Sequence, residues 1–145
     1  MEDIKSLARY VFKTLGAGFS ERVYHNAMEV LLKKHNICFL SEQMIPVMFE
    51  GVKVGDVRAD LVISDKICVE LKALGCVKDE HLTQCQMYMK LLNLTDGIVI
   101  NFPKFDDEEV EFEEISTSTT CKRCGRDSHD ESTCYAKNHL NGYKL

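Results

Sequence analysis

The sequence predicts an α/β domain in which helices flank a central mixed sheet. Apolar residues recur at helical spacing in two N-terminal segments, and short β-type runs occupy residues 37–72. A further helical segment at 80–93 is then followed by a short, continuously apolar run at 98–101. This order of elements is typical of helices packed against a sheet.

The first two elements are expected to be amphipathic helices. The first spans 2–15 and ends at Gly16 and Gly18, with its apolar face formed by Ile4, Leu7, Ala8, Val11, Phe12 and Leu15. Ser20 is expected to cap the second, which runs to about Asn36. Glu21 lies in its first turn, where the helix dipole favours an anion. A purely structural role for Glu21 is therefore one interpretation.

The strands are predicted from β-type runs bounded by turn residues. Pro46 indicates an edge strand, Glu50-Gly51 a turn, and Thr95-Asp96-Gly97 the turn before the apolar run. Val110 and Phe112 alternate with glutamates and could form one last edge strand. The expected strands are 37–40, 44–49, 52–63, 67–72 and 98–101, with the helix 80–93 before the last of them.

Size and composition indicate one domain with a small appendage. The chain has 145 residues and a mass of 16.6 kDa, of which 45% are hydrophobic and 28% charged. No apolar run approaches the ~20 residues of a membrane span, and the N-terminus does not resemble a signal peptide. We expect a soluble, intracellular protein, cytoplasmic or nuclear. Four cysteines are expected to be free core thiols: Cys38, Cys68, Cys76 and Cys85.

Charge divides the chain into three parts. Residues 1–104 carry 13 Lys and Arg against 13 Asp and Glu, whereas 105–120 carry seven acidic residues and no basic ones. Residues 121–145 are mildly basic. We interpret 1–104, extended to 115 if the last strand forms, as the main domain and 105–120 as an acidic, Ser/Thr-rich linker. Residues 121–145 form a separate tail.

The segment 58–73 predicts a hairpin that brings charged residues together. If Ser64-Asp65-Lys66 is the turn, Asp60 lies opposite Glu70, with Cβ atoms about 5 Å apart. Strand alternation places Lys72 on the same face as both carboxylates. Like charges in this arrangement need compensation from solvent, from Lys72 or from a bound cation.

Two interpretations of this face remain open from the residues themselves. One is a surface hairpin stabilised by a salt bridge. The other is a site for Mg²⁺ or Mn²⁺, because hard divalent cations take oxygen ligands and often use one or two carboxylates with water and phosphate. A lysine beside such an ion could orient a water or stabilise charge on a phosphate. Those are the groups required for metal-assisted phosphodiester hydrolysis.

The spacing of Asp60 from Glu70-Leu71-Lys72 resembles the signature of the PD-(D/E)XK nuclease superfamily. Other segments match as well: Gly18-x-x-Glu21-x-x-Tyr24, His81-x-x-Gln84-x-x-x-Tyr88 and the strand ending in Ile100-Asn101-Phe102. Together they resemble the GxxExxY group of this superfamily over roughly residues 4–104. The resemblance implies a restriction-endonuclease-like core and a nuclease that hydrolyses DNA or RNA. Ala59 stands where many members have proline.

The resemblance also implies roles for individual residues. Asp60 and Glu70 would bind Mg²⁺ or Mn²⁺, with the Leu71 carbonyl as a further ligand, and Lys72 would position the attacking water or the phosphate. The remaining implied residues are Glu21 as an additional carboxylate, Gln84 facing the site, and Tyr88 supporting it or contacting nucleic acid. His25 is expected to be exposed on its helix, and His81 partly exposed, with a contact to the site or to phosphate as the alternative.

The tail contains a second motif, CKRCGRDSHDESTC, at 121–134. Cys121, Cys124, His129 and Cys134 have the C-x2-C-x4-H-x4-C spacing of a zinc knuckle, with His139 as a possible substitute ligand. Zn²⁺ would supply the folding energy of a segment with almost no apolar core. Residues that could contact single-stranded nucleic acid are Lys122, Arg123, Arg126, Tyr135 and Lys137. The tail also resembles knuckles attached to giant-virus proteins, which implies a viral origin and the host cytoplasm.

Three functions therefore remain open. The first is a metal-dependent nuclease whose knuckle helps to bind nucleic acid, and it is the one we favour. The second is an inactive nuclease fold that binds nucleic acid, and the third is a protein-docking module. A homodimer is possible in each case. Binding of a divalent metal at Asp60 and Glu70 separates the first function from the other two.

Overall fold

The computed structural model describes residues 1–117, which form three helices and one five-stranded mixed sheet. Residues 1–115 form one compact unit. The helices are α1 (Glu2–Leu15), α2 (Glu21–Lys34) and α3 (Asp79–Leu92). The strands are β1 (Phe39–Phe49), β2 (Val52–Ile63), β3 (Ile67–Lys72), β4 (Asp96–Asn101) and β5 (Glu111–Ser116). The predicted fold class is confirmed.

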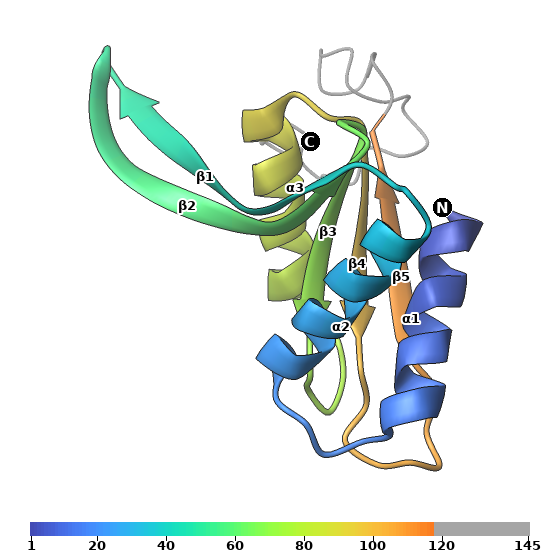
Figure 1. The fold of residues 1–145 in the computed structure, drawn as a ribbon. Coiled ribbons are helices and arrows are strands. Elements are labelled where there is room, and N and C mark those ends of the chain that lie inside the picture. The colour runs from blue at the N-terminus through green and yellow to red at the C-terminus, as the bar shows by residue number, and fades with distance from the viewer. Residues whose placement is uncertain (118–145) are drawn as a thin grey trace. The chain divides into compact units, whose positions relative to one another are not determined.

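The sheet has the order β1-β2-β3-β4-β5, and helices cover both of its faces (Figure 1). Helices α1 and α2 pack on one face, in a cluster that contains Leu61, Val69 and Ile100. Helix α3 packs on the other face, where Val62 and Cys68 meet Cys85 and other α3 residues. Both faces of the β2–β3 hairpin are therefore covered by helices. From the sequence we expected the face that carries Asp60 and Glu70 to be a surface or a metal site, not part of the core.

Strands β1 and β2 form a long antiparallel hairpin that curves away from the helices (Figure 1). Two runs that we expected as separate strands, 37–40 and 44–49, belong mostly to β1, which continues through Glu42 although its φ is positive. Pro46 lies in β1, at the edge of the sheet, as expected. The turn at Glu50-Gly51 uses positive φ at both residues.

Strand β5 lies within the acidic segment and makes specific contacts with the domain. Lys5 forms an ion pair with Glu114, and the Arg9 guanidinium lies 4.9 Å from the centroid of the Phe112 ring. Glu111 accepts a 3.0 Å hydrogen bond from the backbone N–H of Val77. Two carboxylates of the segment that we interpreted as a spacer, Glu111 and Glu114, thus have structural partners in the sheet domain.

One local prediction is wrong in part, and another is confirmed in position only. Cys68 and Cys85 are buried, but Cys38 and Cys76 are exposed, because they lie in the connections before β1 and α3 rather than on an inward face. Ser20 occupies the N-cap position of α2, yet its side chain makes no capping bond. Its carbonyl instead accepts hydrogen bonds from the N–H groups of Val23 and Tyr24.

No helix in residues 1–117 is long and apolar enough to cross a membrane.

Gly97 allows α3 to pack closely against β4. A Cβ atom at this position would lie 2.5 Å from Met89 Sδ and 3.0 Å from Cys85 Sγ, both in buried residues. We expect Gly97→Ala to lower the free energy of unfolding by about 1–3 kcal/mol through overpacking. Denaturant unfolding measures this change in the free energy of unfolding. Gly55→Ala is the control, because a Cβ at Gly55 meets nothing within 4 Å. Equal losses in both variants would contradict the packing argument.

Candidate active site

The β2–β3 hairpin brings Asp60 and Glu70 together in the predicted register. Leu61 pairs with Val69, and Ile63 pairs with Ile67, so Asp60 and Glu70 occupy the next opposed positions. Their side chains each bond to the neighbouring strand's backbone: the Asp60 N–H donates to Glu70 Oε2 at 3.1 Å, and the Leu71 N–H donates to Asp60 Oδ2 at 2.8 Å. These two bonds hold both carboxylates at fixed positions.

Glu70 is a buried carboxylate next to a second one. Its relative exposure is 2%. Burial, together with the charge of Asp60, raises the pKa of Glu70 from 4.5 to about 9, although the backbone hydrogen bond from Asp60 and the nearby Lys72 act in the opposite direction. Around neutral pH the pair is therefore more stable with a bound proton or a bound cation than as two ionised carboxylates alone.

Lys72 ends β3 and reaches the side chain of Gln84 on α3. Its Nζ donates a 3.2 Å hydrogen bond to Gln84 Oε1. The positive charge of Lys72 lowers the pKa of both Glu70 and Glu21 relative to what burial alone would produce. The lysine is therefore within electrostatic range of both carboxylates, and Gln84 faces it as expected.

Glu21 begins α2 and belongs to the same electrostatic environment. Its side chain is half-buried, and burial, followed by the charge of Asp60, raises its pKa above the ordinary value. The opposing influence of Lys72 again indicates proximity to the site. The structure therefore brings the charged residues of the expected constellation into one region: Glu21, Asp60, Glu70 and Lys72.

Tyr88 lies one helical turn beyond Gln84 and is buried. Burial and the charges of Glu70 and Asp60 raise the pKa of its hydroxyl, which keeps the phenol protonated. The side chain is 6% exposed and packs in the α3 cluster with Cys68 and Met89. The buried position favours the first of the two roles expected for Tyr88, support of the site, over a contact with nucleic acid, and the role itself stays a prediction.

Two residues that help to position the site were given no role from the sequence. The Tyr24 hydroxyl donates a 2.7 Å hydrogen bond to the Gly16 carbonyl, and its ring stacks on Phe102 at 4.4 Å. Tyr24 therefore fixes the loop that leads into Glu21. Its place in the Gly18-x-x-Glu21-x-x-Tyr24 spacing was the available signal, but we gave it no role beyond that resemblance.

Asn101 is the second residue that was missed. It is 1% exposed, and its side chain pairs with both backbone groups of Leu74: Oδ1 accepts from the Leu74 N–H at 2.7 Å, and Nδ2 donates to the Leu74 carbonyl at 2.9 Å. The N–H of Phe102 also donates to the Lys72 carbonyl at 2.9 Å. These bonds fix the chain as it leaves Lys72, at the edge where parallel β3 and β4 end together.

The two histidines have structural partners. The prediction for His25 is wrong: it is 3% exposed, and its Nε2 lies 2.7 Å from Glu29 Oε2 and 3.0 Å from Ser41 Oγ. The ring joins α2 to β1, a contact that helical spacing alone does not reveal. His81 is partly buried, and its Nδ1 accepts a 2.9 Å hydrogen bond from the Lys78 N–H at the start of α3.

The site offers a small set of oxygen ligands. Within residues 1–117 there is no group of three or more His, Cys, Asp or Glu residues that could hold a metal ion. Asp60 Oδ1 and Glu70 Oε1 lie outside the two backbone bonds described above. Two carboxylates whose mutual repulsion is offset only in part by Lys72 and the backbone N–H groups suit a hard cation that completes its coordination with water and phosphate. The donor set therefore fits Mg²⁺ or Mn²⁺.

The predicted zinc ligands and the basic residues of the tail lie outside the described residues. They are Cys121, Cys124, His129, Cys134 and His139, with Lys122, Arg123, Arg126, Tyr135 and Lys137. Their roles remain predictions.

Comparisons with known proteins give the family. The family model described as the PD-(D/E)XK nuclease superfamily matches residues 1–115, which include the whole constellation. No curated protein matches this chain.

Five chains of solved structure match. SSO0001 is 25% identical, with a TM-score of 0.51, and the match covers 77% of this chain and 52% of that one. This chain therefore spans about half the length of SSO0001. The alkaline exonuclease LHK-Exo from Laribacter hongkongensis is 13% identical, with a TM-score of 0.48, over 77% of this chain and 68% of its own.

Proposed function

The chain belongs to the PD-(D/E)XK nuclease superfamily, and on that premise we propose that it is a metal-dependent nuclease that hydrolyses phosphodiester bonds. The observation that carries this proposal is the opposed pair of the buried Glu70 and the half-buried Asp60, each held by a backbone N–H, within electrostatic range of Lys72. A surface salt bridge would not account for it, because Glu70 is almost fully buried and Asp60, another carboxylate, acts on its pKa more strongly than Lys72 does.

Each side chain has a role that follows from its position. Asp60 Oδ1 and Glu70 Oε1 would hold Mg²⁺ or Mn²⁺, with the Leu71 carbonyl as a further ligand. When bound, the metal would polarise the phosphate and favour ionisation of a water. Lys72 would orient that water or stabilise the charge that develops on the phosphate.

Glu21 would provide a third carboxylate from the start of α2. Its pKa is raised by burial and by Asp60, so it holds a proton more readily than an ordinary glutamate. It is therefore suited to accept a hydrogen bond or a proton from water at the edge of the metal site. Glu21→Gln tests whether this carboxylate contributes.

Gln84 would act as a positioning residue for Lys72. Without its carbonyl oxygen, the ammonium loses a 3.2 Å hydrogen bond and becomes free to move away from the phosphate. We expect Gln84→Ala to lower kcat about tenfold to a hundredfold, with little change in nucleic-acid affinity. Thr83→Ala, an exposed change on the same helix, is the matched control. A loss confined to affinity would contradict this role.

The tail would add a zinc knuckle that assists binding of nucleic acid. Zn²⁺ would be held by Cys121, Cys124, His129 and Cys134, and the nearby basic residues with Tyr135 would contact single-stranded bases and phosphates. Metal analysis of the purified chain is expected to find one zinc per molecule. Cys124→Ser is expected to abolish zinc binding and weaken nucleic-acid affinity.

The function itself is tested with labelled single- and double-stranded DNA and RNA, incubated with Mg²⁺ or Mn²⁺ or with EDTA. We expect cleavage of at least one substrate in the presence of metal and none in EDTA. Absence of cleavage on every substrate, with metal binding intact, would refute the proposal and favour a nuclease fold that only binds nucleic acid.

A further inference from the structure

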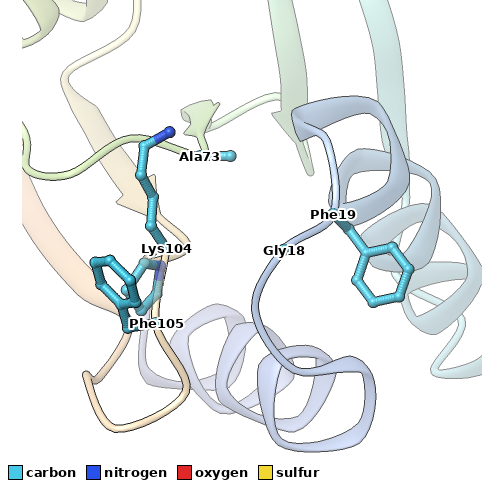
Figure 2. Close-up of a pocket in the computed structure, with 6 residues that line it drawn as sticks. Gly18, Phe19, Ala73, Lys104 and Phe105 are labelled. Carbon is cyan, nitrogen blue, oxygen red and sulfur yellow. The ribbon is translucent and has the colours of Figure 1, made fainter.

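A pocket lies beside the candidate active site and is not used by the chemistry proposed above. Its volume is about 360 Å³, within the range of roughly 300–1,000 Å³ that is usual for ligand pockets. Figure 2 shows Gly18 on one wall and the Lys104 side chain on the other, extending toward Ala73. The lining residues are Gly18, Phe19, Ala73, Pro103, Lys104 and Phe105.

The topology places this pocket next to Lys72. Parallel β3 and β4 end side by side, with Lys72 opposite Asn101. Ala73 directly follows the first strand end, and the segment Pro103–Phe105 follows the second. The opposite wall, at Gly18 and Phe19, is the loop that leads into Glu21. Both walls are thus continuous with residues of the active site.

The two walls are held together by side chains. Asp106 Oδ1 accepts a 2.7 Å hydrogen bond from the Ala17 N–H, which ties the α1–α2 loop to the segment after β4. Tyr24 bonds to Gly16 and stacks on Phe102 across the same gap. Gly18 has a φ of +102°, which L side chains rarely adopt, and a Cβ there would meet nothing within 4 Å, so this wall borders open space. The pocket is therefore a built feature of the fold.

Its chemistry combines one cation with exposed apolar surface. None of the ion pairs of residues 1–117 includes Lys104, although four acidic residues follow within 106–109. Phe105 is 65% exposed. A cation that lacks a carboxylate partner suits a phosphate, and an exposed aromatic ring suits the face of a base. In a duplex the bases are stacked inside and cannot reach such a ring.

From this we infer that the pocket holds one unpaired nucleotide next to the phosphate that is cut, with its phosphate on Lys104 and its base against Phe105. The position relative to the cut rests on the proposed nuclease function. The consequence is a preference for single-stranded nucleic acid, or for unpaired ends and flaps, over continuous duplex.

The test uses the full chain with a labelled single strand, the same strand in duplex, and single strands that lack one base at each position in turn. Binding is measured in EDTA by fluorescence anisotropy, and cleavage is measured with Mg²⁺. Phe105→Ala is expected to weaken binding of the intact single strand about tenfold, and to have no effect when the base in the pocket is absent. Lys104→Ala is expected to weaken binding severalfold and to reduce the salt slope by about one.

Two matched controls keep the result specific. Phe49→Ala removes a phenylalanine that is also 65% exposed, at the far end of the β1–β2 hairpin, and Lys66→Ala removes an exposed lysine in the β2–β3 turn. The inference is overturned if the pocket variants equal these controls, or if Phe105→Ala weakens duplex and single strand alike.

The binding and cleavage arms separate this inference from the proposed function. If the wild type cuts a single strand but the pocket variants bind and cut like the controls, the pocket inference fails and the function stands. The opposite result is that the wild type cuts no substrate, while Phe105→Ala still weakens binding of the intact strand and has no effect on a strand that lacks one particular base. In that case the pocket inference stands and the catalytic proposal fails.

Discussion

Asp60→Asn and Glu70→Gln are each expected to lower kcat/KM for nucleic-acid cleavage by about a thousandfold or more. A metal ion that stabilises transition-state charge contributes several kcal/mol, and about 1.4 kcal/mol corresponds to a factor of ten in rate. Each substitution removes one charged oxygen ligand while leaving a group that can accept the same backbone hydrogen bond. The fold should therefore be preserved while cleavage is lost.

Circular dichroism and nucleic-acid affinity serve as the controls for this prediction. Asp56→Asn, at an exposed position in the same strand, provides a matched substitution that should leave cleavage unchanged. Full cleavage by either site variant at saturating Mg²⁺ would show that these carboxylates are structural.

Glu70→Gln is also expected to stabilise the metal-free protein, with a gain that grows as the pH rises. In the folded state the raised pKa keeps Glu70 protonated up to about pH 9, whereas the unfolded chain releases the proton near pH 4.5. Between these values unfolding releases a proton, so the wild-type free energy of unfolding falls as pH increases, by up to about 1.4 kcal/mol per pH unit. A glutamine side chain does not ionise in this pH range, so the variant lacks this loss of stability.

Denaturant unfolding in EDTA at pH 5 and pH 8 measures this difference. We expect the gain from Glu70→Gln to be about 2–4 kcal/mol larger at pH 8 than at pH 5. Glu50→Gln, in the exposed turn between β1 and β2, is the control and should show no such trend. A gain that is equal at both pH values would mean that Glu70 is ionised throughout and that the like charges are compensated by the protein itself.

The local pattern of the sequence predicted the parts of the site that depend on short-range geometry. The turn at 64–66 fixes which residues oppose each other, so Asp60 and Glu70 could be paired before the structure was known. The helical interval between Gln84 and Tyr88 likewise placed both on the face of α3 that meets the site. These relations need only one turn or one helix to be right.

Features that depend on distant segments could not be predicted in the same way. His25 is buried because Ser41 in β1 lies against α2, and helical spacing contains no information about that neighbour. The charged face of the hairpin is covered by α3, so Glu70 is far more buried than hairpin alternation indicated. The pocket at Lys104 requires the α1–α2 loop and the segment after β4 to meet through Asp106, across 89 residues of sequence.

Mn²⁺ binding to the full chain, measured by titration calorimetry in two buffers of different ionisation enthalpy, tests the central claim most directly. If Asp60 and Glu70 hold the metal, the wild type should bind Mn²⁺ and release close to one proton at pH 7, because the cation displaces the proton that Glu70 retains. Asp60→Asn and Glu70→Gln should lose this binding event. Equal Mn²⁺ binding by wild type and both variants, without proton release, would contradict a metal site at this pair.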